Sequence, residues 1–174
     1  MDKINIQEIY DNARRDPSLF STLDIENILK SIENEQNNYL ENKTLDDVIE
    51  EIRIKLSELN LPIENLRILC EKLMDFRYVD EINELHKGKF VRWIRTDSPE
   101  KKLYNGGIVM DIKFMDSGVQ VLCKNNMNRF IQYKFDECIT FQKLNVEEQL
   151  LLLAYSSREE ISTPITNGFT RLQH

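Results

Sequence analysis

The feature that most constrains the fold is a change of hydrophobic period at Gly88. Upstream of it the apolar residues recur with helical spacing, whereas between residues 88 and 144 they alternate as in strands. Five runs rich in β-branched and aromatic residues, each bounded by turn residues, cover 89–95, 107–114, 118–124, 129–135 and 138–144. Because five short apolar strands expose two edges unless the sheet closes, the pattern predicts a five-stranded antiparallel barrel over residues 87–144.

The second and third runs predict a hairpin register. A turn at residues 115–118 is expected to pair Phe114 with Val119 and Ile112 with Val121. Strict alternation then predicts the core-facing residues of the second run to be Ile108, Met110, Ile112 and Phe114.

The next hairpin is expected to place Val121 opposite Ile131. In that register Leu122 and Phe130 lie on the outer face, and two apolar side chains there indicate that another element covers part of the barrel.

Tight turns combined with one long, polar first connection over residues 96–105 resemble an SH3-like barrel of the Tudor or KOW kind. The resemblance covers roughly a third of the chain and rests on residues 88–93, on Gly106 and Gly107 before the second strand, and on the turn at residues 116–118. The spacing of residues 88–94, 106–109 and 141–144 is also similar to barrels in uncharacterised and virion proteins of large DNA viruses. The resemblance implies a module that binds peptides, modified side chains, nucleic acid or neighbouring subunits, and that is seldom an enzyme.

The formal net charge of −7 conceals a sharp division along the chain. Residues 1–86 carry ten Lys or Arg against twenty Asp or Glu, residues 87–144 carry eleven against six, and residues 145–174 carry two against four. A basic barrel is therefore joined to an acidic half. The candidate residues for binding a partner or nucleic acid are Lys89, Arg92, Arg95, Lys101, Lys102, Tyr104, Lys113, Lys124, Arg129, Phe130 and Lys134, with Trp93 as a further stacking candidate.

Residues 1–86 are predicted to form an acidic helical bundle. Helical stripes occur within residues 6–13 and 25–32. Thr44 and Asp47 resemble a capping box before a third helix, Pro62 suits the first turn of a fourth that includes Phe76, and a short last helix is expected over residues 80–85. A partner-binding face, or an arm packed on a copy of itself, is the alternative to a self-contained bundle.

Two segments follow the barrel. Residues 145–157 are predicted to form an apolar helix that packs on the barrel or at a subunit interface, because residues 149–155 lack a polar face. Residues 158–174 are predicted to be a flexible or partner-binding tail. Its interleaved apolar residues, which would lie along the sheet edge of a neighbour, are Ile161, Ile165, Phe169 and Leu172.

Several chemistries find no support in the residue pattern. The only histidines are His86 and His174, so a Ser or Cys triad lacks a positioned base. Cys70, Cys123 and Cys138 are widely spaced, which favours reduced thiols over a zinc site. No phosphate-binding loop occurs, and we predict no metal and no cofactor.

One catalytic alternative remains at the sequence level. Asp111 and Lys113 on a strand, with Asp97 and Glu100 upstream, resemble the carboxylates and lysine of Mg²⁺-dependent nucleases. Solvated charges on a strand are the competing interpretation.

The missing catalytic residues, the charge division and the apolar carboxy-terminal segments predict a non-enzymatic structural or adaptor protein that contacts other protein subunits, of the same or a different chain. The resemblance to virion proteins implies a minor capsid or virion component. Nucleic-acid binding by the basic barrel, to DNA or RNA, is the alternative. A polar amino terminus and a longest apolar run of only residues 150–155 predict no signal peptide and no membrane partner. The expected location is intracellular, in the cytoplasm or nucleus, or in a virion.

Overall fold

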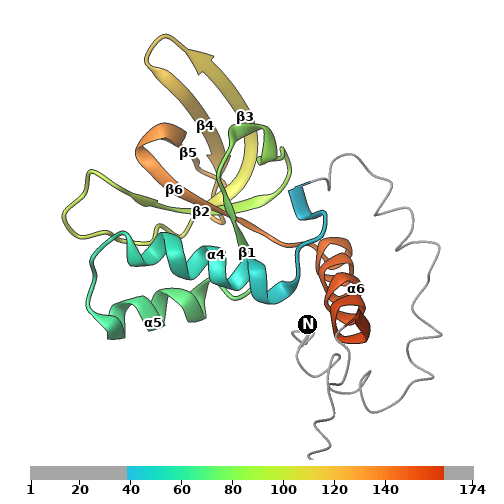
Figure 1. The fold of residues 1–174 in the computed structure, drawn as a ribbon. Coiled ribbons are helices and arrows are strands. Elements are labelled where there is room, and N and C mark those ends of the chain that lie inside the picture. Colours follow the sequence, from blue (N-terminus) through green and yellow to red (C-terminus); the bar gives the residue numbers. More distant parts are fainter. Residues whose placement is uncertain (1–38, 163–174) are drawn as a thin grey trace, which may run out of the picture.

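The computed structural model describes residues 39–162. It combines helices with one antiparallel sheet, so the expected α+β class is confirmed (Figure 1). Helix α4 covers Leu45–Ser57 and α5 covers Ile63–Lys72, before strand β1 at Phe76–Val79. The remaining elements are a 3₁₀ turn η2 (Ile82–Glu84), β2 (Phe90–Arg95), β3 (Gly107–Met115), β4 (Gly118–Lys124), β5 (Phe130–Lys134), a 3₁₀ turn η3 (Phe135–Glu137), β6 (Cys138–Lys143) and α6 (Val146–Ser162).

Some predicted elements fall outside the described residues: the first two helices, before residue 39, and the tail residues Ile165, Phe169 and Leu172. Ile161 belongs to the last turn of α6, which continues beyond the expected end at residue 157. Among residues 39–162, no helix is long and apolar enough to cross a membrane.

The sheet is open, and the prediction of a closed five-stranded barrel is wrong. Its strand order is β1-β6-β2-β3-β4-β5. The five predicted runs coincide with β2 to β6, but β1 adds a sixth strand. A strand has two edges, and β6 uses one for β2 and the other for β1. No edge of β6 therefore remains for β5, which lies at the end of the sheet.

Strand β1 corrects the expectation that residues 1–86 are all helical. Phe76 pairs with Lys143 and Val79 with Thr140, so residues 76–79 belong to the sheet. Helix α5 ends at Lys72, and the expected short helix over residues 80–85 is a single 3₁₀ turn. The segment consists of Phe, Arg, Tyr and Val, most of which favour strands, and pairing with β6 satisfies its backbone.

The predicted β3–β4 register is confirmed near the turn, where Phe114 pairs with Val119 and Ile112 with Val121. The predicted core face of β3 is wrong over most of its length. A bulge between Val109 and Asp111 leaves Met110 unpaired and reverses the alternation, so that Val109 is buried. The predicted core residues Ile108, Met110 and Phe114 are exposed instead, Phe114 by 74% near the hairpin tip.

The β4–β5 register differs from the prediction by two residues. Val121 pairs with Tyr133, and Ile131 pairs with Cys123. A shift of two keeps every side chain on its face, so Tyr133 still points into the core and Phe130 stays outside it.

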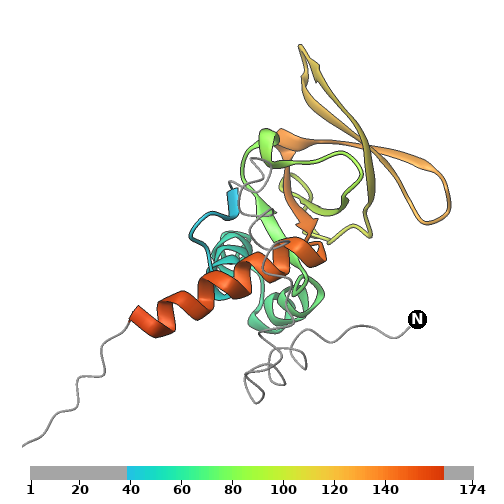
Figure 2. The ribbon, with the colours of Figure 1, turned by 90° about the vertical axis from the view of Figure 1, so that its right-hand side faces the viewer.

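Two apolar cores lie on opposite faces of β2. Ile94 packs with Ile52, Leu56 and Leu73 of the helical layer. Trp93 and Val91, on the other face, pack with residues of β3, β4 and β5. The β3–β4 hairpin projects away from α4 and α5 in both views (Figures 1 and 2).

The helix boundaries follow their caps. The predicted capping box is present, because the Asp47 backbone N–H donates to Thr44 Oγ1 and the Thr44 N–H donates to Asp47 Oδ2. At α6, Asn145 and Glu148 form the equivalent pair of hydrogen bonds, at 2.6 and 2.7 Å. Helix α6 packs on α4 and on Leu144 beyond β6, and Phe130 stays exposed.

Two glycines with positive φ offer a direct test of how closely β2 and β3 are packed. A Cβ at Gly106 (φ 77°) would lie 1.7 Å from the Val91 carbonyl oxygen, whereas a Cβ at Gly88 (φ 84°) meets nothing within 4 Å. Gly88→Ala is expected to cost about 1–2 kcal/mol of the free energy of unfolding, from backbone strain alone. Gly106→Ala is expected to cost about 1–3 kcal/mol beyond the same strain, because the backbone of β2 must move. Urea unfolding followed by Trp93 fluorescence measures both, and equal losses would contradict the packing described.

Candidate protein-interaction surface

Strands β3, β4 and β5 form an arm, defined here as residues 107–134, with one face in the core and one outside it. Val109, Val121, Cys123 and Tyr133 point into the core. Residues that pair directly across antiparallel strands share a face. The outer face therefore carries three rows, which are Ile108, Lys124 and Phe130; Asp111, Leu122 and Gln132; and Lys113, Gln120 and Lys134.

The first row is the most apolar part of the outer face. Ile108 is 45% exposed and Phe130 is 63% exposed, on either side of Lys124. Met127, in the loop between β4 and β5, is also exposed. Neighbouring exposed apolar side chains of this size are typical of an interaction surface.

Positive charge surrounds this row. The side chains of Lys124, Arg129 and Lys113 form no ion pair with any residue between 39 and 162. Lys134 is paired with Glu137 at 2.8 Å. Four of the predicted binding residues, Lys113, Lys124, Phe130 and Lys134, are thus brought together on one face, with Arg129 immediately before β5.

The other predicted cations are spread over different elements, and most are already engaged. Lys89 lies 3.4 Å from the buried carboxylate of Glu148. Arg95 forms two hydrogen bonds with Asp97, which hold the pKa of that carboxyl below its usual value. Lys101 donates to the carbonyl of Thr96.

Arg92 is half-buried, and burial lowers its pKa. Its guanidinium donates to the backbone carbonyls of Tyr104 and Lys72, at 3.2 and 3.4 Å. Arg92 therefore ties the long loop and α5 to β2, while Lys102 in that loop is exposed.

Tyr104 is the outer member of a stack of three rings. Its ring lies 5.7 Å from that of Trp93 and nearly parallel to it, and Trp93 stacks on Tyr133 at 4.2 Å. Trp93 and Tyr133 are buried, so of the three only Tyr104 offers exposed ring surface. The stack stabilises the long loop over the core and does not form an open cage.

Two of the three carboxylates of the nuclease-like alternative are bound to a cation, and the third, Glu100, is exposed. Asp111 lies 2.6 Å from Lys87, whose hydrogen bond lowers the pKa of that carboxyl, and Asp97 is bound to Arg95. Within residues 39–162, no three acidic, His or Cys side chains are grouped as a metal site requires.

All three thiols are free. Burial raises the pKa of Cys123 and of Cys138 to about 12, so both stay protonated at neutral pH. A protonated thiol is a weak nucleophile.

A buried polar network, which sequence reasoning missed, joins the helices to the sheet. Arg77 of β1 is 2% exposed, its guanidinium lies 3.7 Å over the Tyr39 ring, and it pairs with Glu84 at 3.2 Å. The Tyr39 hydroxyl donates to Glu148 of α6, which is 1% exposed. Burial raises the pKa of Tyr39, so this hydroxyl keeps its proton.

His86 lies in the same network. Its ring is 5.5 Å from that of Tyr39, and its backbone N–H donates to Gln142 at 2.9 Å. The only sequence signal for the network is Arg77 within an apolar run, which also fits the polar face of a helix.

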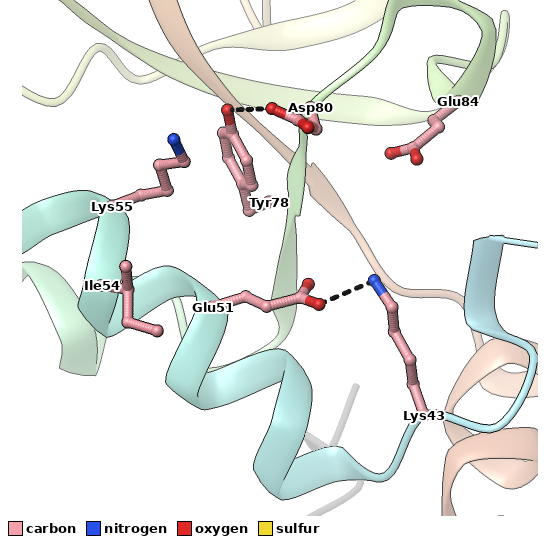
Figure 3. Close-up of a pocket in the computed structure, with 7 residues that line it drawn as sticks. All are labelled: Lys43, Glu51, Ile54, Lys55, Tyr78, Asp80 and Glu84. Atoms are coloured by element: carbon pink, nitrogen blue, oxygen red, sulfur yellow. Dashed lines mark hydrogen bonds and ion pairs between the residues drawn. The ribbon is translucent and has the colours of Figure 1, made fainter.

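A pocket of about 270 Å³ lies between α4 and β1 (Figure 3). Its charged groups are already matched to one another. Lys43 pairs with Glu51 at 2.7 Å, the Tyr78 hydroxyl donates to Asp80 at 2.8 Å, and the Lys55 ammonium lies 5.2 Å from the centre of the Tyr78 ring. This pairing indicates a solvated surface and selects no ligand.

Comparison with known proteins identifies no relative: no family model, no curated protein and no solved structure matches the chain.

His86 predicts a pH dependence of stability. Burial, the Arg77 guanidinium and the Lys89 ammonium lower its pKa below 6.5, against the opposing effect of Glu148. The unfolded chain therefore binds the proton more tightly, and the free energy of unfolding falls as the pH drops from about 7 through the folded pKa of His86. One proton limits this slope to about 1.4 kcal/mol per pH unit. Chemical unfolding between pH 7 and pH 5 is expected to show a shallower slope in His86→Gln, and an unchanged slope would contradict this role.

Proposed function

We propose that this protein is a non-enzymatic structural or adaptor protein, and that the outer face of its arm is a protein-binding surface. The observation that carries this proposal is the exposed row of Ile108, Lys124 and Phe130 on a paired, ordered sheet. An apolar centre with a polar, charged rim is the usual anatomy of a protein interface.

The shape of the domain supports the same role. The order of β2 to β6, with one long connection between β2 and β3 and tight turns afterwards, supports an SH3-like connectivity for this part of the sheet. Modules of that kind bind peptides or neighbouring subunits on their exposed strands and loops.

Site-specific photocrosslinking in the native cells tests the proposal. A photoreactive amino acid at position 108 is expected to give a discrete protein adduct, and the adduct is expected to disappear when Phe130→Ser is added. The matched control is position 63 on α5, where Ile63 is even more exposed but lies in the helical layer. Equal adducts at positions 108 and 63, or none at position 108, would contradict the proposal.

The Phe130→Ser variant used there is expected to remain folded. The Phe130 side chain is already 63% exposed, so the change is expected to alter the free energy of unfolding by no more than about 0.5 kcal/mol. Thermal unfolding of the purified variant provides this check.

Nucleic-acid binding is a second candidate, favoured by one specific observation. Lys124, which pairs with the exposed Phe130, and Arg129, which precedes it in the chain, form no ion pair with the described residues, so both cations are free to bind phosphates near a stacked base. Most of the other predicted cations already bind groups of the same chain, so few remain to contact phosphates.

Fluorescence anisotropy of the full chain with labelled single-stranded DNA and RNA tests this candidate. Binding is expected to weaken with rising salt, and about tenfold or more in Lys124→Glu/Arg129→Glu, because two phosphate contacts become repulsive. Arg53→Glu, a charge reversal on exposed α4, serves as the control and should leave affinity unchanged. Absence of binding at low salt removes nucleic acid from consideration.

A further inference from the structure

Strand β5 has an edge that no other strand of residues 39–162 occupies. Within that part of the chain it pairs with β4 alone, at the end of the sheet. The Asn125 N–H donates to the Arg129 carbonyl at 2.9 Å, and hydrogen-bonded and non-hydrogen-bonded pairs alternate along an antiparallel ladder. Ile131 and Tyr133 therefore bond to β4, while the backbone groups of Phe130, Gln132 and Lys134 point outward.

The centre of this edge is unused within the described part of the chain. No residue between 39 and 162 forms a hydrogen bond with the backbone of Phe130 or Gln132. The strand contains no proline, and its pairing with β4 shows no bulge. An unprotected edge of this kind is a template for another strand.

The sequence of β5 is complementary to itself in the antiparallel direction. With Gln132 at a two-fold axis, Gln132 pairs with Gln132 of a second copy and Phe130 pairs with Lys134. Phe130, Gln132 and Lys134 then each pair with a residue of the second copy whose backbone groups also point outward. No two like charges face each other in this register, and the exposed Phe130 is covered by the Lys134 stem.

Charge at the two ends of β5 favours the same arrangement. The exposed Arg129, which forms no ion pair with the described residues, precedes the strand, and the acidic Asp136 and Glu137 follow it. Antiparallel pairing brings Arg129 of each copy toward the acidic turn of the other. A two-fold axis produces this contact twice, which makes the ends of the pairing electrostatically complementary.

From these observations we propose that β5 is a docking edge for a second copy of this chain, so that two sheets join through an antiparallel β5–β5 pair. The inference deepens the proposed function, on which it rests, by naming one protein partner. The two fail separately, because the photocrosslink at Ile108 reports any partner whereas self-association reports only this edge.

Sedimentation velocity of the full chain tests the edge. The 20.7 kDa chain is expected to sediment as a dimer with a dissociation constant below about 100 µM, which corresponds to roughly −5.5 kcal/mol. Gln132→Pro removes an outward N–H and no backbone bond to β4, so it is expected to sediment as a monomer. Gln132→Thr, which keeps the N–H, is the matched control and is expected to remain a dimer.

Folding of the variants is checked independently by thermal unfolding and by amide exchange of β4. A wild-type chain that stays monomeric at several times that concentration overturns the proposal. So does a dimer that Gln132→Pro leaves intact while β4 remains protected.

A charge exchange tests the two-fold geometry itself. Arg129→Glu is expected to raise the dissociation constant at least tenfold, because the introduced carboxylate then faces the acidic turn of the second copy. Glu137→Arg is expected to do the same through repulsion from Arg129 of the second copy, and it also removes the Glu137–Lys134 ion pair within each copy. The double variant Arg129→Glu/Glu137→Arg is expected to return within about threefold of wild type, since two attractive contacts are restored. Additive loss in the double variant would overturn this register.

Discussion

The pairing of β6 on both of its edges is the constraint on which the rest of this structure depends. One edge joins β2, and the other joins β1, which arrives from the helical half of the chain. The first consequence is that the helical layer and the sheet share one core, because Phe76, Ile94 and Phe141 meet the residues of α4 and α5. The second is that β5 has no strand of the described chain on its outer side.

The buried polar network reinforces this connection and makes it specific. Arg77, Glu148 and Gln142 come from β1, α6 and β6, and all three are almost completely removed from water. Burying charge is unfavourable unless the charges are paired and hydrogen-bonded. Alternative arrangements of α6 on the sheet would leave Glu148 without Lys89 and Tyr39, so the network selects one position for the helix.

Unlike the buried network, the arm leaves apolar side chains, charges and backbone groups on its outer face without partners among residues 39–162. Toward the core Val109, Val121, Cys123 and Tyr133 are buried. On the outer face lie an apolar row, cations without ion pairs among the described residues, and a strand edge that no other described strand occupies. These three features are unfavourable for an isolated monomer and favourable for binding. Their coincidence on one side of the sheet is why we propose recognition between proteins as the function.

Local patterns in the sequence determined the strands β2 to β6, the turn between β3 and β4 and the capping box at Thr44, because each of these depends on neighbouring residues only. The sequence also proposed Lys113, Lys124, Phe130 and Lys134 as binding residues, but it could not distinguish them from Lys89 or Arg95. That distinction required knowing which carboxylates, such as Glu148, come close in space.

Tertiary structure alone decided three things. Residues 76–79 became a strand because β6 offered a free edge, whereas local spacing favoured a helix. The bulge near Met110 reversed the face of Ile108, because the pairing of β3 with β2 and β4 outweighs strict alternation. The barrel remained open because β6 can pair with only two strands. Each outcome depends on competition for backbone hydrogen bonds between segments far apart in the chain, which a local pattern cannot encode.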